Sequence, residues 1–405
     1  MAQGVTHSSS SKITEAELDE FAYPFTPAFN SGFMETADGP TLREPHRIFY
    51  QQFGNPTGEP VMFIHGGPGG GATDNAKYLT RFFNPERYQV NLFDQRGCGG
   101  STPSVAVDPK AALTNNTTDY LVSDIVNLRD EFGIKGKMHV FGGSWGMTLG
   151  MKTLIQHSEL VQTWIPRGAF LGRRADVRAL YQGPDVGEKR DVHNVPPLGT
   201  YLTHPEAWRQ FIEVIPKKDR GDLIAAYAKI FDMEPKNEAE RQYQLDAVKA
   251  WSTYEFNVSY LKQKLQKTSE LSDEEARKAI DMGRIEMHYF RNNMFFPSPN
   301  HLLDHVHVIA KARIPIHLVQ GRYDVVCPPY QAEDLDAAFT AAGSPLASYT
   351  LTTAGHSMLC RENFFALKKV MDELPPMTAY DLGQRQRQQQ QIWTPPAPGL
   401  RPAGQ

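Results

Sequence analysis

Ser144 stands in a short stretch whose residue types could perform nucleophilic catalysis. Residues 142–146 read Gly-Gly-Ser-Trp-Gly, which follows the pattern G-x-S-x-G. A serine in this pattern is exposed for attack when a strand precedes it and a helix follows, because the turn between them is sharp. The apolar run 138–141 predicts that strand, and residues 147–155 predict that helix. A chance Gly/Ser-rich turn would have the same letters, so the motif needs partners before it indicates chemistry.

Asp324 and His356 are the candidate partners, and each follows a predicted strand. Asp324 comes after the apolar run 314–320, and His356 comes after the run 347–351. Loops that follow parallel strands share one edge of a sheet, where the serine turn would also lie. His356 could then take the proton of Ser144 while Asp324 orients the imidazole. A surface histidine and an aspartate turn are the alternatives, but all three residues in the order Ser, Asp, His indicate an α/β-hydrolase triad.

A glycine-rich loop at residues 65–71 (His-Gly-Gly-Pro-Gly-Gly-Gly) follows another predicted strand. It lacks the G-x-x-x-x-G-K-[ST] pattern of a phosphate-binding P-loop. We therefore expect an oxyanion hole, in which the backbone N–H groups of Gly67 and Trp145 would face the developing charge. A tight turn without a ligand is the alternative. Asp94 and Arg96 are expected to brace the neighbouring loops through charge-assisted hydrogen bonds.

The elements that must position these residues alternate between strands and helices. Further strands are predicted at 59–64, 88–93 and 161–165, an antiparallel pair within 32–54, and further helices at 120–132 and 363–373. This order predicts an α/β fold with a mostly parallel sheet flanked by helices. Between them, helical patterns without strands at 205–215, 221–233, 237–266 and 273–290, together with an irregular loop at 183–202, predict an inserted α-helical cap.

The domain layout follows from these patterns. We expect a flexible N-terminal segment at 1–31, a hydrolase core at 32–171 and 306–374, a helical cap at 172–305, and a disordered Gln/Pro-rich tail at 375–405. A length of 405 residues allows one large domain with an insertion, or two domains.

Composition excludes several classes of function. The net charge of −4 gives no bulk electrostatic case for a nucleic acid or membrane partner. Three widely spaced cysteines without a C-x-x-C pair disfavour a disulfide framework or a zinc site, and we expect neither a metal nor a cofactor. The N-terminus has no apolar segment typical of a secretory signal, and no apolar run approaches the roughly 20 residues that span a bilayer. A cytoplasmic location is therefore expected, while the oligomeric state is not predicted.

Five segments together resemble the proline iminopeptidase (prolyl aminopeptidase) family of α/β hydrolases. They are residues 65–71, 94–99, 142–146, 321–324 and 354–356, and the similarity extends from about residue 32 to residue 373. The resemblance implies an enzyme that removes an N-terminal proline from a small peptide or amino-acid amide. It also implies an acyl-enzyme, no metal, and an oxyanion hole formed by Gly67 and Trp145.

The resemblance places specificity in the cap. The family's Trp-Ser…Glu segment matches residues 251–255, and its Ile-Glu-x-His-Tyr-Phe segment matches residues 285–290. Glu255 and Glu286 are therefore the candidates for binding the terminal ammonium group, which an exopeptidase must recognise by charge. Two solvent-facing glutamates are the alternative.

Three further residues are implied to bind the substrate. Phe170 and Phe290 match the family's proline-pocket aromatics, although both could be ordinary core residues. Arg167 matches a family arginine beside the site, and it is expected to support the acidic pair.

The sequence also departs from the family. The stretch between Gln182 and Pro205 is longer than usual, and residues 179–181 (Ala-Leu-Tyr) stand where consecutive aromatics are typical. These differences leave open a hydrolase that cleaves an amide, ester or thioester of a specialised metabolite on the same scaffold. A non-catalytic binding protein is a third hypothesis, which the complete triad and both oxyanion loops disfavour.

Overall fold

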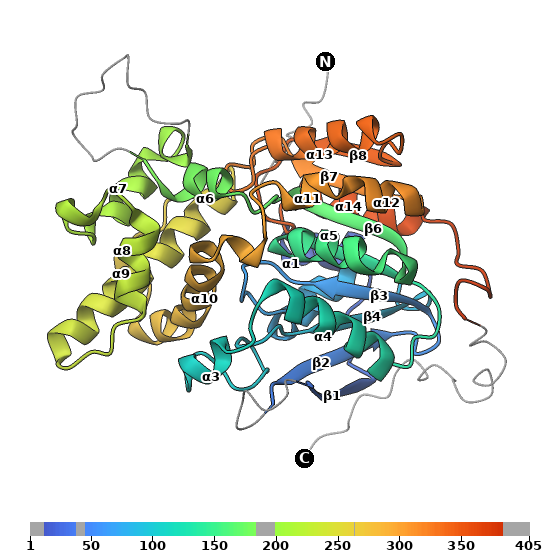
Figure 1. Ribbon diagram of the computed structural model, residues 1–405, viewed down its shortest axis with the longest axis horizontal. Coiled ribbons are helices and arrows are strands. Elements are labelled where there is room, and N and C mark those ends of the chain that lie inside the picture. The colour runs from blue at the N-terminus through green and yellow to red at the C-terminus, as the bar shows by residue number, and fades with distance from the viewer. Residues whose placement is uncertain (1–11, 38–44, 184–198, 263, 384–405) are drawn as a thin grey trace.

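A computed structural model describes residues 12–37, 45–183, 199–262 and 264–383 of the chain (Figure 1). Its centre is a sheet of eight strands in the order β1-β2-β4-β3-β5-β6-β7-β8. The strands β1 and β2, and β2 and β4, pair antiparallel, whereas all other neighbours are parallel. The bounds of the strands are Asn30–Glu35 (β1), Arg47–Gly54 (β2), Glu59–Ile64 (β3), Tyr88–Phe93 (β4), Met138–Ser144 (β5), Val161–Ala169 (β6), His317–Gly321 (β7) and Ser348–Thr352 (β8). The predicted mostly parallel sheet is confirmed.

Helices cover both faces of the sheet, which is why β3 and β4 are buried along their whole length. One core lies under α4, α5, α12 and α13, and the other lies under α1, α2 and α14. The bounds of the helices in the core are Glu15–Phe21 (α1), Ala76–Leu79 (α2), Pro109–Leu113 (α3), Thr118–Glu131 (α4), Trp145–His157 (α5), His301–Asp304 (α11), Val306–Ala312 (α12), Tyr330–Ala341 (α13) and Arg361–Glu373 (α14).

The chain between β6 and α11 forms the cap, which lies to one side of the sheet in Figure 1. Its helices are Arg174–Tyr181 (α6), Pro205–Glu213 (α7), Leu223–Phe231 (α8), Glu238–Ser259 (α9) and Asp273–Arg291 (α10). The long helix α9 packs against α7, α8 and α10. Aromatic rings fill the space between them, and the pairs Tyr181–Trp251 and Phe211–Tyr254 stack with centroids 4.4 Å apart. The predicted helical cap is therefore present.

The structure differs from the expected layout at three places. Residues 15–21 form α1 with a capping box at Thr14 and a buried Leu18, so the flexible segment expected at 1–31 is wrong from residue 12 onward. The tail expected from residue 375 is packed as far as 383, since Met377 and Leu382 are buried. The short helix α11, expected in the cap, contacts α5 of the core. Residues 1–11 and 384–405, and most of the loop expected at 183–202, lie outside the described residues.

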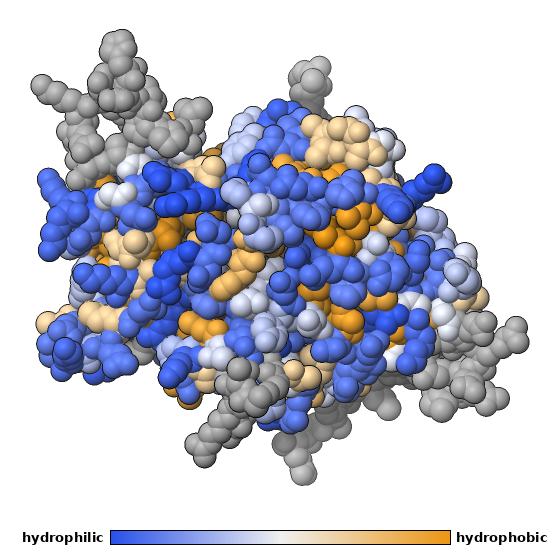
Figure 2. Space-filling view, in the orientation of Figure 1, coloured by the Kyte–Doolittle hydropathy of each residue, from blue (hydrophilic) through white to orange (hydrophobic). Residues whose placement is uncertain are grey.

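The surface on the side shown in Figure 2 is mainly hydrophilic, and hydrophobic residues form small separate patches. Among the described helices, none is both long and apolar enough to cross a membrane.

Candidate active site

Ser144 occupies the predicted sharp turn between β5 and α5. Its backbone is in a conformation that side chains rarely adopt, with φ 57° and ψ −127°. A Cβ atom on Gly146 would lie 2.1 Å from the carbonyl oxygen of Ile64, and one on Gly142 would lie 2.9 Å from the same oxygen. Glycine at both positions therefore lets β5, α5 and β3 approach closely enough to present Ser144 at the edge of the sheet.

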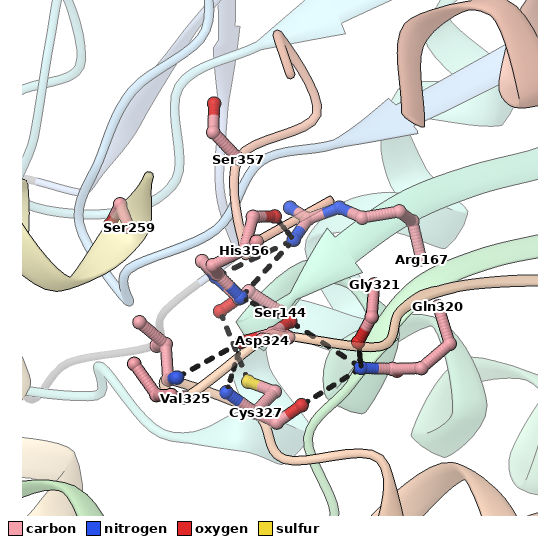
Figure 3. A network of polar contacts seen from close by, with 12 residues as sticks. Ser144, Arg167, Ser259, Gln320, Gly321, Asp324, Val325, Cys327, His356 and Ser357 are labelled. Carbon is pink, nitrogen blue, oxygen red and sulfur yellow. Dashed lines mark hydrogen bonds and ion pairs between the residues drawn. The ribbon is translucent and has the colours of Figure 1, made fainter. Parts of the chain in front are cut away.

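Asp324 and His356 meet at the carboxyl ends of β7 and β8. His356 Nδ1 lies 2.8 Å from Asp324 Oδ2, and the other carboxylate oxygen accepts the backbone N–H groups of Val326 (3.0 Å) and Cys327 (2.7 Å) (Figure 3). These contacts fix the carboxylate and place the imidazole proton on Nδ1, which leaves Nε2 free to accept a proton. Burial lowers the pKa of His356, and the charge of Asp324 opposes this effect. A neutral imidazole suits a general base.

Ser144 and His356 line the same cavity. The Ser144 hydroxyl lies 3.9 Å from the sulfur of Cys327, and no hydrogen bond joins it to His356 in the described part of the chain. Catalytic hydrogen bonds in ligand-free enzymes are often long and tighten when substrate binds. The structure thus brings the three predicted residues together, with the last contact between hydroxyl and imidazole still to form.

The glycine-rich loop after β3 faces Ser144. A Cβ atom on Gly66 would lie 3.9 Å from Ser144 Oγ, and Gly67 lines the cavity with φ +112°. A side chain at Gly67 would meet the backbone nitrogens of Gly69 and Gly70 at 2.7 and 2.8 Å. Trp145 begins α5 directly after Ser144. The two predicted oxyanion-hole residues therefore both lie near the serine.

Asp94 and Arg96 brace these loops, as predicted. Asp94 Oδ1 accepts the backbone N–H groups of residues 72 and 73 at 2.7 and 3.1 Å, which holds the end of the glycine-rich loop. Arg96 makes a buried two-point contact with Asp124 at 2.6 and 2.7 Å. The Trp145 indole N–H donates to Gln95 over 2.9 Å.

The cavity has a volume of about 180 Å³ and extends from Ser144 into the cap. Glu255 of α9 and Glu286 of α10 line it, together with the predicted aromatic pair Phe170 and Phe290. Other apolar side chains complete its wall: Val177, Leu180, Val258, Met282 and Val326. One small, largely apolar space is therefore lined by a serine hydroxyl, an imidazole, the guanidinium of Arg167 and three carboxyl groups, those of Glu255, Glu286 and Asp176.

The two glutamates have no basic partner in the described chain; Glu286 is buried, and Glu255 is partly buried. Glu286 is 1% exposed and accepts the indole N–H of Trp251 over 2.7 Å, while Glu255 accepts the hydroxyl of Tyr181 over 2.5 Å. Neither forms an ion pair with a lysine or arginine of the described chain. Burial raises the pKa of Glu255 to about 7, and burial with the charge of Glu255 raises the pKa of Glu286 well above its usual value. The pair therefore retains a proton near neutral pH and lacks a cation.

Tyr181 was not recognised as a site residue from the sequence. It stands in the segment 179–181 that departs from the family's aromatic pattern, yet its hydroxyl holds Glu255 and its ring lines the cavity. Its stacking on Trp251 depends on packing between α6 and α9, which no local pattern reveals.

Arg167 lies beside His356, and the expectation that it supports the acidic pair is not met. Its Nη1 atom lies 3.4 Å from both ring nitrogens of His356 and donates to the His356 carbonyl oxygen over 2.5 Å. Equal distances to both nitrogens place the guanidinium against the ring face. A Cβ atom on Gly143 would lie 2.4 Å from Arg167 Nη2, so this glycine provides the space for the guanidinium. Arg167 also lines the cavity, where its predicted contact with substrate remains a prediction.

Histidine, cysteine, aspartate and glutamate side chains form no group of three that could hold a metal ion in the described residues.

Fold and site together define the class of the protein. Residues 59–360 match the family model described as alpha/beta hydrolase fold, so the chain is an α/β hydrolase. A solved structure from work on carboxylesterases of Nitrososphaera gargenis has the same fold, with a TM-score of 0.50, 12% identity, and coverage of 84% of this chain and 97% of that one.

Comparison with curated relatives identifies the family of α/β hydrolases to which the chain belongs. A proline iminopeptidase of Xylella fastidiosa (strain 9a5c) is 39% identical over 346 residues, which cover 85% of this chain and 96% of the relative. A proline iminopeptidase of Arabidopsis thaliana is 38% identical and covers 81% and 75%, and one of Neisseria gonorrhoeae is 33% identical and covers 87% and 99%. The chain therefore belongs to the proline iminopeptidase family, which confirms the resemblance found in the sequence.

Proposed function

We propose that this protein is a serine aminopeptidase that releases N-terminal proline from small peptides. The observation that carries the proposal is the pair Glu255 and Glu286, which has no lysine or arginine partner in the described chain and lines the cavity that also contains Ser144 and His356. Two carboxyl groups without a cation are costly to ionise in an apolar space, and a terminal ammonium group would supply the missing charge. The names of the curated relatives support the same activity.

Proline fits this pair for a chemical reason. A protonated N-terminal proline is a secondary ammonium with two N–H groups, so Glu255 and Glu286 could each accept one. Its ring carries three methylene groups, which would pack against Phe170 and Phe290. Glu255 and Glu286 would thus recognise the free N-terminus of the substrate, and Phe170 and Phe290 would select the proline ring.

The geometry supports an acyl-enzyme mechanism. Ser144 would attack the prolyl carbonyl while His356 Nε2 takes the hydroxyl proton, and Asp324 would stabilise the imidazolium. The backbone N–H groups of Gly67 and Trp145 would bind the oxyanion. His356 would then pass the proton to the leaving amine, and a water molecule activated in the same way would release proline.

A substrate panel tests the function. We expect the purified protein to hydrolyse prolyl anilides and Pro-X dipeptides, and to lose this activity when the prolyl nitrogen is acetylated. Ser144→Ala should reduce kcat by about 10⁴-fold or more. Equal turnover of free and acetylated substrates would exclude an aminopeptidase, and unchanged activity in Ser144→Ala would exclude Ser144 as the nucleophile.

We further propose a cytoplasmic location. The free, buried thiols of Cys98, Cys327 and Cys360 support a reducing compartment. Cell fractionation with activity measurement tests it, and activity confined to a secreted fraction would contradict it.

A further inference from the structure

The cap contacts the loop of His356 at the C-terminal end of α9. The backbone N–H of Ser357 donates to the carbonyl oxygen of Ser259 over 3.0 Å, and the Ser357 hydroxyl donates to the phenol oxygen of Tyr260 over 3.2 Å. A Cβ atom on Gly355 would lie 3.2 Å from the same Ser259 oxygen, so the two segments are in close contact. Figure 3 shows Ser259 and Ser357 near the imidazole. Both chain neighbours of His356 therefore touch the cap.

The core holds the same loop from its other side. The side-chain amide of Asn363 donates to the carbonyl oxygens of Gly355 (3.0 Å) and Ser357 (2.9 Å). Arg167 donates to the carbonyl oxygen of His356 itself. The loop thus contacts both α14 of the core and the end of α9. A movement of the cap would therefore displace the imidazole of His356.

The same end of α9 carries one of the substrate-binding candidates. Glu255 lies four residues before Ser259, and the Ser259 hydroxyl donates to the Glu255 carbonyl oxygen over 2.7 Å, which closes the last turn. One turn of an α-helix rises about 5.4 Å. A short rigid segment therefore separates the carboxyl group that faces the cavity from the contact with the histidine loop.

We infer that Tyr260 and Ser357 are positioning residues, which fix the His356 loop to α9 so that one helix sets the spacing between the ammonium-binding carboxylate and the general base. The role of Glu255 rests on the proposed function, whereas the role of His356 as base does not depend on proline as substrate. Such positioning matters here because the imidazole has still to reach Ser144. A misplacement of about 1 Å can reduce a rate about 10²-fold.

The test uses Tyr260→Phe and Ser357→Ala, with Tyr243→Phe as the matched control. Tyr243 is a half-buried tyrosine on the same helix and lies outside the active-site cavity. We expect both variants to lower kcat for a prolyl anilide about tenfold, as a displacement of a few tenths of an ångström would, with KM within about twofold of wild type. Thermal unfolding would verify that each variant is folded, and Tyr243→Phe should match wild type.

A double variant separates positioning from simple loss of packing. Because Tyr260 and Ser357 share one hydrogen bond, the double variant should be no slower than the slower single variant. Losses that multiply, or kcat values equal to wild type in both single variants, would overturn the inference. So would an effect confined to KM, since Tyr260 also lines a neighbouring cavity of about 550 Å³ and would then act as a binding residue.

An ester without an amino group distinguishes this inference from the proposed function. Its hydrolysis needs Ser144 and His356 but no ammonium site, so Tyr260→Phe should lower its kcat as well. If the wild type turned over the ester but no prolyl substrate, the proposed function would fail while the ester data still tested the positioning. If prolyl turnover were normal and Tyr260→Phe were silent on both substrates, the positioning would fail alone.

Discussion

At the scale of single residues, the site contrasts a carboxylate that accepts several hydrogen bonds with two glutamates that have fewer donors and no basic partner in the described chain. Asp324 is buried and accepts hydrogen bonds from two backbone N–H groups and from the imidazole. Glu255 accepts the phenol hydroxyl of Tyr181, and Glu286 accepts the indole N–H of Trp251. The glutamate pair has no cation beside it, and a bound ammonium group would stabilise its negative charge.

Neutralising the pair should weaken recognition of the amine. For Glu255→Gln and Glu286→Gln we expect kcat/KM for free prolyl substrates to fall about 10- to 100-fold, because a charge-assisted contact in an apolar site is lost. Turnover of an amine-free ester should change little. Glu234→Gln, at an exposed glutamate of the cap, is the control. Wild-type kinetics in both cavity variants would refute the ammonium site.

The same pair should make stability depend on pH. An acid with a raised pKa in the folded state favours folding when protonated, and this contribution is lost as pH rises from the ordinary value of 4.5 through the folded pKa, about 7 for Glu255. Glu286→Gln removes one charge, so its Tm relative to wild type should increase between pH 5 and pH 8, by about 2–4 °C. Differential scanning calorimetry of ligand-free protein would measure it. A Tm difference independent of pH would show that the pair does not share a raised pKa.

At the scale of elements, the crossing of β5 and α5 over β3 presents the nucleophile. The crossing is tight because the backbones of Gly142 and Gly146 lie almost against the Ile64 carbonyl. The strained conformation of Ser144 is thereby imposed by packing on both sides.

Adding one methyl group should disrupt this crossing. Gly146→Ala would place its Cβ 2.1 Å from Ile64 O, and we expect the free energy of unfolding to fall by about 2 kcal/mol or more, together with activity. Gly221→Ala is a matched control, because a Cβ there meets nothing within 4 Å. Urea unfolding of both variants measures the effect. Equal midpoints would mean that the elbow relaxes without cost.

At the scale of the whole molecule, residues 375–383 after α14 pack at the amino ends of β3 and β5, whereas the active site lies at the carboxyl ends of the strands. The Met377 N–H donates to Glu59 at the start of β3 over 3.1 Å, and the Lys137 N–H donates to the Asp381 carbonyl just before β5 over 2.7 Å. Met377 and Leu382 are buried there. Residues 375–383 are therefore part of the fold.

Two truncations test this role. A chain ending at Leu374 should be less stable than one ending at Gly383 by about 3 kcal/mol, because two buried side chains and their hydrogen bonds are lost. Both truncated proteins should retain hydrolytic activity at low temperature, since residues 375–383 lie far from the active-site cavity. Equal unfolding midpoints for the two truncations would contradict the packing of this segment.

The sequence predicted the sheet well, and the reason is physical. The runs 59–64 and 88–93 are apolar throughout because helices cover both faces, so their limits agree with β3 and β4. Residues 15–21 were missed because α1 buries a single residue, Leu18, which gives almost no periodic signal. The packing of 375–383 depends on partners more than 200 residues away.

Some residues of the candidate site could likewise be placed from the sequence, and others could not. Ser144, Asp324 and His356 could be placed because topology alone brings strand ends together. Arg167 could not, since a long side chain at the end of β6 can turn toward either the cap or the histidine. The structure turns it toward His356. Tyr181 depends in turn on how two cap helices pack.

The cap leaves the sheet after β6 and returns at β7, and these two strands are neighbours. Trp164 N–H already bonds to the Pro315 carbonyl, and Arg167 pairs with Val319 in register, so the two ends of the insertion are joined by the sheet itself. A gene in which the cap was exchanged would still encode Ser144, Asp324 and His356, because all three lie outside the insertion. New specificities could therefore arise in this scaffold by exchange of the cap between two points of the chain that lie side by side in the structure.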